Sequence, residues 1–271
     1  MNRFLKERIG PAPHLALDRM GVGELLICLH GIGGNRSNWR DQLPEFGRYF
    51  QAVSLDFRGY GDSEDFEDSL DPRDFVEDVL RVINHFRADT AHLMGLSMGG
   101  LVAMRFADIY PERLASLTLC DTNLGFSNVS PERRRQFLDL RLAPLLAGAE
   151  PRDIAPAVAE ALVSPSVTAV AFQRLLDSVA QLHKTSYMKT LEGMSTDAYA
   201  FELEKISVPT HVIVGENDPA TPPALSRTLA TRIPGGRLSV VPGAGHLSNI
   251  ERPSEFTAIS LGFLLSLRVT S

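Results

Sequence analysis

Short apolar runs that end in turn residues recur along the first half of the chain. They are LLICLHG at residues 25–31, AVSLDFRG at 52–59, AHLMGLS at 91–97 and LASLTLCDT at 114–122. Such runs are typical of parallel strands that are covered on both faces, because neither face meets water. Each run therefore predicts a buried strand that leads into a polar loop.

Between these runs the apolar residues take helical spacing. A helix is predicted over residues 72–86, and a second one, residues 98–114, follows Ser97 directly. The apolar face of the first helix consists of Phe75, Val76, Val79, Val82, Ile83 and Phe86. Strands that alternate with helices predict an α/β fold, with a mostly parallel sheet flanked by helices.

From residue 123 to 203 the pattern changes to one helix after another. We interpret this stretch as a helical insertion and expect it to form a cap over the functional site. The strand pattern returns at residues 208–218 and 237–246, and residues 253–268 predict a closing amphipathic helix. The prediction divides the chain into an α/β core, residues 1–122 and 204–271, and a cap insertion, residues 123–203.

Composition narrows the class of ligand. The 271 residues carry a net charge of −6, so no basic excess exists to bind nucleic acid. No segment approaches about 20 uninterrupted apolar residues, and we expect no membrane association. Cys28 and Cys120 each lie in an apolar run, which is typical of buried, reduced thiols and favours a cytoplasmic location. Small molecules are the expected partners.

The stretch GLSMGG, residues 95–100, places one serine among small residues. It fits the G-x-S-x-G pattern of a sharp strand-to-helix turn, and the strand and helix are predicted on the correct sides. Glycine-rich turns of this kind also occur for packing alone. Gly95 and Gly99 would avoid clashes beside Ser97, and the Met98 N–H would start the helix and face a developing negative charge. Ser97 is the predicted nucleophile.

A serine hydroxyl needs a base, and the base needs an orienting acid. His246 is the predicted base, because it lies in a glycine-flanked loop just after the last strand. Asp218, after another strand, is the predicted acid, and the order Ser97, Asp218, His246 is that of α/β-hydrolases. Two other carboxylates stay open as the acid: Asp121, at the end of a strand, and Glu216, close to Asp218.

A glycine-rich loop, residues 29–39, follows the earliest of these strands. The N–H of Ile32 is predicted to form an oxyanion hole together with the N–H of Met98. We interpret His30 as a scaffold residue of this loop. Neither G-x-G-x-x-G nor G-K-[ST] is present, so the loop does not predict a nucleotide site. No metal or organic cofactor is expected.

Five motifs together resemble the α/β-hydrolase superfamily over nearly the whole chain. They are HG at 30–31, DFRGYGDS at 56–63, GLSMGG at 95–100, GENDPATPP at 215–223 and GAGHLSNIERP at 243–253. The resemblance implies the α/β-hydrolase fold and assigns the catalytic triad to the same nucleophile, acid and base. It implies structural roles for three residues of the second motif, Asp56, Arg58 and Ser63.

Within the superfamily, residues 110–122, 208–223 and 243–256 look most like 3-oxoadipate enol-lactone hydrolases, and residues 186–206 are loosely similar to the end of their cap. This likeness implies a serine hydrolase that opens a small, carboxylate-bearing lactone in the breakdown of aromatic compounds. The chain departs from that branch at residues 30–36, where HGIGGNR replaces an N-S-L-G-T-type loop. The exact substrate therefore stays open.

An acidic substrate would need a cation near the pocket. Arg134 and Arg141 share a side of a predicted cap helix at seven-residue spacing, and we predict that one of them binds a substrate carboxylate. Runs of arginine on a helix are also typical of a solvated face. The other cap cations considered are Arg133, Arg135, Arg174 and Lys184.

Two alternative functions would use the same triad. A general carboxylesterase or a carbon–carbon bond hydrolase would prefer neutral acyl esters or ring-cleavage diketones. A ligand-binding receptor of the same fold would bind tightly and turn over slowly. Substrate preference and turnover distinguish these alternatives from a lactonase.

Overall fold

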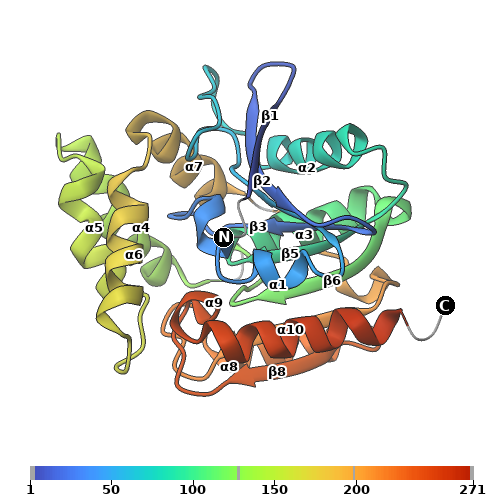
Figure 1. Cartoon of the computed structure of the whole chain (residues 1–271). Helices are drawn as coiled ribbons and strands as arrows, with labels where there is room; N and C mark the ends of the chain where they lie inside the picture. The colour runs from blue at the N-terminus through green and yellow to red at the C-terminus, as the bar shows by residue number, and fades with distance from the viewer. Residues whose placement is uncertain (1–3, 127–128, 198, 269–271) are drawn as a thin grey trace.

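The computed structural model describes residues 4–126, 129–197 and 199–268, and its strands form one sheet (Figure 1). Among the described residues the sheet has eight strands in the order β1-β2-β4-β3-β5-β6-β7-β8. The pairs from β4 through β8 are parallel, which confirms the predicted α/β fold with a mostly parallel sheet. The strands are β1 Leu5–Ile9, β2 Leu15–Met20, β3 Leu25–Leu29, β4 Gln51–Leu55, β5 Ala91–Leu96, β6 Leu114–Cys120, β7 Thr210–Gly215 and β8 Arg237–Val241.

The antiparallel hairpin of β1 and β2 has no counterpart in the sequence prediction. It adds to the sheet through β2, which pairs with β4. Strand β1 is LKERI and lies at the sheet edge, with most of its residues exposed. A charged edge strand lacks the continuous apolar run that identified the central strands, which explains why the pattern did not reveal it.

Helices cover both faces of the sheet. In β3, Leu25, Ile27 and Leu29 pack into one apolar cluster with α2 and α3, while Leu26 and Cys28 pack into the other with α1 and α10. Alternate side chains of a strand point to opposite faces, so each strand joins the two clusters. The helices of the core are η1 Arg36–Trp39, α1 Leu43–Phe46, α2 Arg73–His85, α3 Met98–Ile109, η2 Pro111–Arg113, η4 Leu203–Lys205, α8 Pro223–Arg232, α9 Ser248–Glu251 and α10 Pro253–Leu267.

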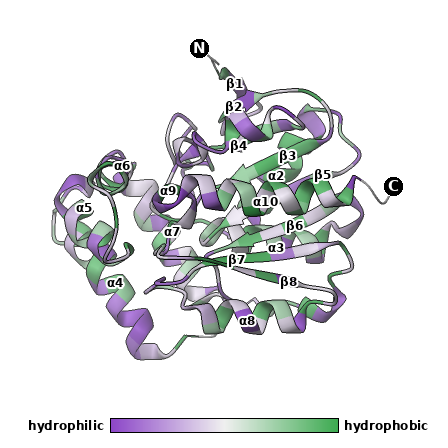
Figure 2. Cartoon of the chain, turned by 60° about the horizontal axis from the view of Figure 1, so that its bottom comes forward, coloured by the Kyte–Doolittle hydropathy of each residue, from purple (hydrophilic) through white to green (hydrophobic). Residues whose placement is uncertain are grey.

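The segment between β6 and β7 is helical in its described residues. It contains α4 Pro131–Leu146, α5 Pro151–Glu160, α6 Ala169–Ala180 and α7 Lys184–Thr196, which we call the cap helices. Helices α4, α5 and α6 lie together at one end of the sheet in both Figure 1 and Figure 2. In the described part of the chain, no helix has both the length and the apolar character that a membrane span requires.

Parallel strands bring distant loops to one edge of the sheet. The carboxyl ends of β3, β5, β6, β7 and β8 all lead into that edge, where ligands bind in open α/β sheets. The loops concerned begin after Leu29, Leu96, Cys120, Gly215 and Val241. Every candidate catalytic residue lies in one of these loops or at the start of the helix that follows it.

The loop after β4 is held by a buried carboxylate. Asp56 is fully buried, accepts hydrogen bonds from the N–H groups of Arg36 (2.6 Å) and Asp62 (2.8 Å), and pairs with the Arg36 guanidinium. The Ser63 hydroxyl donates to the Asp56 carbonyl at 2.6 Å and accepts from the N–H of Ala16 at 2.8 Å. Asp56 and Ser63 therefore have a structural role: they connect β2, β4 and η1 and are not part of the reacting centre.

Arg58 binds a helix instead of a ligand. Its guanidinium donates two hydrogen bonds to the Asp78 carboxylate of α2, at 2.7 and 2.8 Å. Arg81 donates to the same carboxylate at 2.9 Å. The ion pair of Arg58 and Asp78 therefore fixes α2 against the loop after β4.

We expect Asp56→Ala to destabilise the fold. The substitution leaves the buried Arg36 guanidinium and two N–H groups without this acceptor, and loss of one partner of a buried ion pair costs about 3 kcal/mol or more. Urea unfolding would measure the loss in the free energy of unfolding. Glu45→Ala, which removes an exposed pair with Arg48, is the control and should change stability little. Equal stability of the two variants would contradict the structural role of Asp56.

Candidate active site

Ser97 occupies a strained turn between β5 and α3. Its φ of 52° lies in the left-handed region, which a residue with a side chain rarely adopts. A Cβ on Gly95 would lie 2.2 Å from the Gly99 carbonyl oxygen, and one on Gly99 would lie 2.5 Å from the Leu29 carbonyl oxygen. Both flanking glycines are therefore required by close backbone approach, as the motif predicts.

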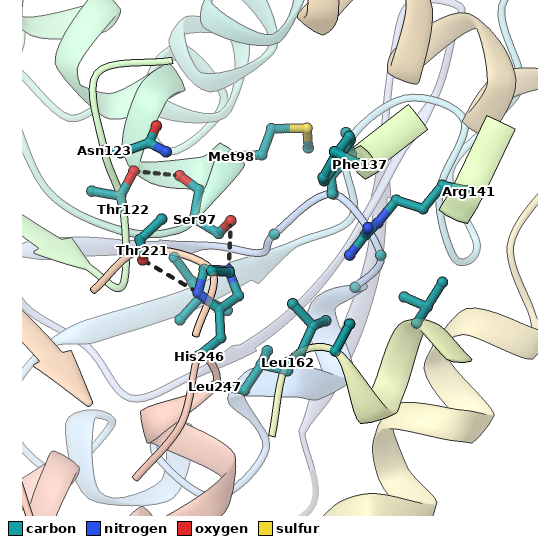
Figure 3. Close-up of a pocket in the computed structure, with 18 of the residues that line it drawn as sticks. Ser97, Met98, Thr122, Asn123, Phe137, Arg141, Leu162, Thr221, His246 and Leu247 are labelled. Carbon is teal, nitrogen blue, oxygen red and sulfur yellow. Dashed lines mark hydrogen bonds between the residues drawn. The ribbon is translucent and has the colours of Figure 1, made fainter. Parts of the chain in front are cut away.

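The structure brings together the three residues of the predicted triad. Ser97 Oγ lies 3.0 Å from His246 Nε2, and His246 Nδ1 lies 2.9 Å from one carboxylate oxygen of Asp218 and 3.1 Å from the other. Since a carboxylate only accepts, Nδ1 carries the proton and Nε2 accepts from the serine hydroxyl. Figure 3 shows the His246 ring pointing toward Ser97, to which it is joined by a hydrogen bond. This arrangement can remove the serine proton.

Asp218 is buried and surrounded by donors. Its carboxylate accepts from the N–H groups of Ala220 and Thr221, both at 2.8 Å, and from the Thr221 hydroxyl at 2.6 Å. Burial raises the pKa of Asp218, but the charge of His246 and these hydrogen bonds outweigh it, so the net pKa is lowered. Burial likewise lowers the pKa of His246, and the Asp218 carboxylate outweighs that effect and raises it. Asp218 therefore stays ionised beside the base.

The two alternative acids take other roles. Asp121 accepts from the Gly215 N–H at 2.8 Å and from the Ser248 hydroxyl at 2.6 Å, and it makes no hydrogen bond to His246 within the described chain. Burial and the charge of Asp218 raise the pKa of Asp121 to about 8. Glu216 is exposed and accepts from the Gly243 N–H. Of these three carboxylates, only Asp218 hydrogen-bonds His246 within the described residues.

A single turn orients the Ile32 amide. The Gly31 carbonyl accepts from His30 Nδ1 at 2.7 Å and from the Gly34 N–H at 3.0 Å. The Phe57 N–H donates to His30 Nε2, so the His30 proton lies on Nδ1, and burial lowers the pKa of this ring to about 4. In a trans peptide the N–H points away from the C=O, so the contacts that hold the Gly31 carbonyl also direct the Ile32 N–H.

The two predicted oxyanion donors are available. Met98 is the first residue of α3, where an N–H has no intrahelical acceptor, and the N–H of Ile32 follows the turn just described. Neither N–H has a hydrogen-bond acceptor among the described residues, and both residues line the cavity that contains Ser97. They can stabilise an oxyanion that develops on a carbonyl bound there.

The cavity beside Ser97 has a volume of about 310 Å³, which suits a small molecule. The triad edge supplies Ser97 and His246, and the cap helices supply a mostly apolar wall that includes Phe137, Leu175 and Val179. Of the described residues that line it, none is acidic. The described part of the chain also holds no group of three metal-ligating side chains.

Arg141 is the deeply buried cation of this cavity. It is 4% exposed, forms no ion pair among the described residues and lies with its guanidinium carbon 4.1 Å from the centre of the Phe137 ring. Burial lowers the pKa of Arg141, an effect that the nearby Tyr187 hydroxyl partly opposes. Figure 3 shows Arg141 pointing into the cavity from the side opposite Ser97. A buried, unpaired guanidinium is a strong candidate for binding an anion.

The two arginines that the sequence spacing predicted as candidate carboxylate ligands, Arg134 and Arg141, lie in different surroundings. Arg134 does not line the cavity, and its guanidinium donates to the Phe126 carbonyl at 2.9 Å. Arg133 lines it instead, because Arg133, Phe137 and Arg141 follow one another at four-residue steps along α4. The seven-residue spacing did not identify this lining face.

Comparison with known proteins agrees with the fold. The sequence model described as "Alpha/beta hydrolase family" matches residues 26–259. A 3-oxoadipate enol-lactonase of Acinetobacter baylyi is 28% identical over 233 residues, which cover 85% of each chain. A thermophilic esterase from Thermogutta terrifontis, solved with malate bound, is 27% identical with a TM-score of 0.86 and coverage of 98% and 99% of the two chains. The enol-lactonase from Burkholderia xenovorans is 27% identical, with a TM-score of 0.79 and coverage of 93% and 96%.

The raised pKa of His246 sets the acid side of the pH profile. His246 acts as a base only when it is neutral, so the rate should fall as pH decreases through its pKa. Asp218→Asn removes the carboxylate while burial remains, and burial lowers this pKa. We expect the acid limb of kcat/KM for a chromogenic ester to move to lower pH, and the plateau to fall by roughly 10³- to 10⁴-fold.

Glu216→Gln is the matched control for this variant, because it removes an exposed carboxylate from the same loop. It should leave both the plateau and the acid limb unchanged. An acid limb that stays in place in Asp218→Asn would show that Asp218 does not raise the pKa of His246.

Proposed function

Since this chain belongs to the alpha/beta hydrolase family, we propose that it is a serine hydrolase that cleaves small esters or lactones through an acyl-enzyme. The chain is a hydrolase enzyme whose relatives include esterases and lactonases. The observation that carries the mechanism is the hydrogen-bonded chain of Ser97, His246 and Asp218 at the cavity wall.

The reaction proceeds in two acyl-transfer steps. Ser97 Oγ attacks the carbonyl carbon while His246 Nε2 takes the hydroxyl proton, and Asp218 stabilises the charged ring. The N–H groups of Ile32 and Met98 donate to the oxyanion of the tetrahedral intermediate. His246 then protonates the leaving oxygen. Water, deprotonated by the same ring, releases the acyl group from Ser97.

We propose further that the substrate carries a carboxylate, which Arg141 binds. A guanidinium that is 4% exposed and has no acidic neighbour in the cavity lacks a counter-ion of its own among the described residues. A carboxylate would supply this counter-ion and satisfy the Arg141 Nε, which has no acceptor there. Apolar walls between Arg141 and Ser97 suit a short carbon chain between the carboxylate and the carbonyl.

A carboxylate-bearing enol-lactone fits these requirements, and 3-oxoadipate enol-lactone is our specific candidate. The A. baylyi and B. xenovorans relatives are both named enol-lactonases. In such a lactone the acyl group and the leaving oxygen belong to one molecule. An enolate leaves more readily than an alkoxide, so the second half of the first step is easier.

Two substrates and one variant test the reaction. We expect purified protein to hydrolyse p-nitrophenyl acetate and, faster, 3-oxoadipate enol-lactone, with both rates followed by absorbance. Ser97→Ala should reduce them at least about 10⁴-fold, because the nucleophile is lost. Turnover of the ester alone would exclude the enol-lactone. Equal rates in the variant, or no turnover of any ester or lactone, would contradict the serine-hydrolase proposal.

Substitution of Arg141 tests the carboxylate. Arg141→Gln should lower kcat/KM for a carboxylated lactone by about 10- to 100-fold, the range expected for a lost charge-assisted hydrogen bond. The methyl ester of the same lactone, which has no charge for Arg141 to bind, should lose at most a few-fold. The comparison of the two substrates separates loss of binding from general damage to the pocket.

Arg134→Gln is the matched control, since Arg134 lies on the same helix but outside the cavity. It should leave both substrates unaffected. An equal loss for charged and neutral substrates in Arg141→Gln, or a larger loss in Arg134→Gln, would exclude Arg141 as the carboxylate ligand.

A further inference from the structure

One cap helix makes a direct hydrogen bond to the glycine loop that carries the Ile32 amide. The Ser178 hydroxyl of α6 donates to the Gly33 carbonyl at 3.1 Å and accepts from the Asn35 side-chain amide at 3.4 Å. Ser178 is 7% exposed, so water competes little for this contact. The contact joins the cap to the core 145 residues earlier in the chain.

From Gly33 the hydrogen bonds continue to the oxyanion donor through two peptide groups. The Gly33 carbonyl and the Gly34 N–H belong to one peptide group, and the Gly34 N–H donates to the Gly31 carbonyl at 3.0 Å. The Gly31 carbonyl and the Ile32 N–H form the next group. We call this series, from the Ser178 hydroxyl to the Ile32 N–H, the amide relay.

We propose that Ser178 is a positioning residue for the oxyanion hole and that it acts through the amide relay; this inference rests on the proposed function. Hydrogen bonds in series polarise one another, so a donor at the Gly33 carbonyl strengthens the Gly34 N–H and, in turn, the Ile32 N–H. The relay also orients both groups, because each carbonyl is held on one side and its N–H must point to the other. The effect grows as negative charge develops on the substrate oxygen.

The glycine loop that carries the Ile32 amide depends on contacts from outside, because its own residues have few side chains that could hold it in place. Gly31, Gly33 and Gly34 have no side chains to pack, and glycine loses the most conformational freedom on ordering. A Cβ on Gly34 would lie 2.1 Å from Asn38 Oδ1, the acceptor of the Asn35 N–H, so a side chain at this position would disturb that hydrogen bond. Anchoring must come from outside the glycines: His30 binds the Gly31 carbonyl and Tyr60 the Ile32 carbonyl from the core, and Ser178 binds the Gly33 carbonyl from the cap.

Helix α6 is held against the same region at a second point. Arg174, one helical turn before Ser178, pairs with Asp41 and donates to the Ser37 carbonyl at 3.4 Å. The two contacts lie on one side of α6 at a four-residue step. The oxyanion loop is therefore fully anchored only while α6 lies against the core, and the cap contributes to rate as well as to substrate selection.

Ser178→Ala tests the amide relay, with Ser195→Ala as its control. Ser195 is also a buried cap serine, 6% exposed, but among the described residues its hydroxyl donates to the Glu192 carbonyl of its own helix. With p-nitrophenyl acetate we expect Ser178→Ala to lower kcat about 5- to 10-fold with KM within about twofold, because one direct oxyanion donor contributes 10²–10³ and Ser178 acts indirectly. Ser178→Thr, which keeps the hydroxyl, should recover most of the rate, and Ser195→Ala should match the wild type.

A second readout does not depend on the substrate. Ser97 Oγ attacks the phosphorus of a fluorophosphonate and displaces fluoride, while the phosphoryl oxygen accepts hydrogen bonds in the oxyanion hole. The labelling rate, followed by mass spectrometry, should therefore fall by a similar factor in Ser178→Ala alone. An unchanged kcat and labelling rate, a loss confined to KM, or no recovery in Ser178→Thr would overturn the relay. Wild-type protein that is labelled but hydrolyses no ester would contradict the proposed function and leave the labelling comparison as the test of Ser178.

Discussion

The close backbone approach around Ser97 is the constraint on which the rest of the site depends. A positive φ of 52° at a serine persists only where its surroundings leave no alternative. Here Gly95 meets Gly99 and Gly99 meets the end of β3, so a side chain at either position would separate β5, α3 and β3. The same packing exposes the hydroxyl, starts α3 at Met98 and places the turn beside the loop of Ile32. The proposed nucleophile and the proposed oxyanion donors therefore share one structural cause.

The surroundings of two neighbouring carboxyl groups shift their pKa values in opposite directions. Asp218 has four hydrogen-bond donors counting His246, and its pKa is lowered in spite of burial. Asp121, fully buried and beside that charge, has its pKa raised to about 8 and links the ends of β6 and β7 to Ser248. Environments that push two pKa values apart are how a site assigns roles to like groups. Of the two carboxyl groups, Asp218 is the one that hydrogen-bonds His246 among the described residues, while Asp121 holds strand ends together.

Local signals in the sequence were enough to predict the parts of the site that depend on strand ends. An apolar run, a G-x-S-x-G turn and a glycine-flanked histidine each report a backbone geometry, so the positions of Ser97, Asp218 and His246 follow from the order of strands. The contributions of the cap could not be predicted in this way. Whether Arg133 or Arg134 faces the cavity depends on how α4 is rotated against its neighbours, and α4 has charged residues on more than one side. Ser178 lies in an ordinary amphipathic helix, and only its distance to Gly33 gives it a role.

These contacts give the cap helices two separable contributions to one reaction. Helix α4 brings Arg141 into the cavity, where we propose that its charge binds a substrate carboxylate, while α6 brings Ser178 to the glycine loop, where we propose that it orients the backbone. A change on α4 can alter which molecule binds without disturbing the relay, because no described hydrogen bond joins Arg141 to the glycine loop. Loss of the Ser178 hydroxyl from α6 should slow every substrate, since all of them develop the same oxyanion, whereas Leu175 and Val179 of the same helix line the cavity and bear on substrate selection. Substitutions on α4 can therefore change substrate preference while the oxyanion geometry is kept, provided that α6 remains held against the core.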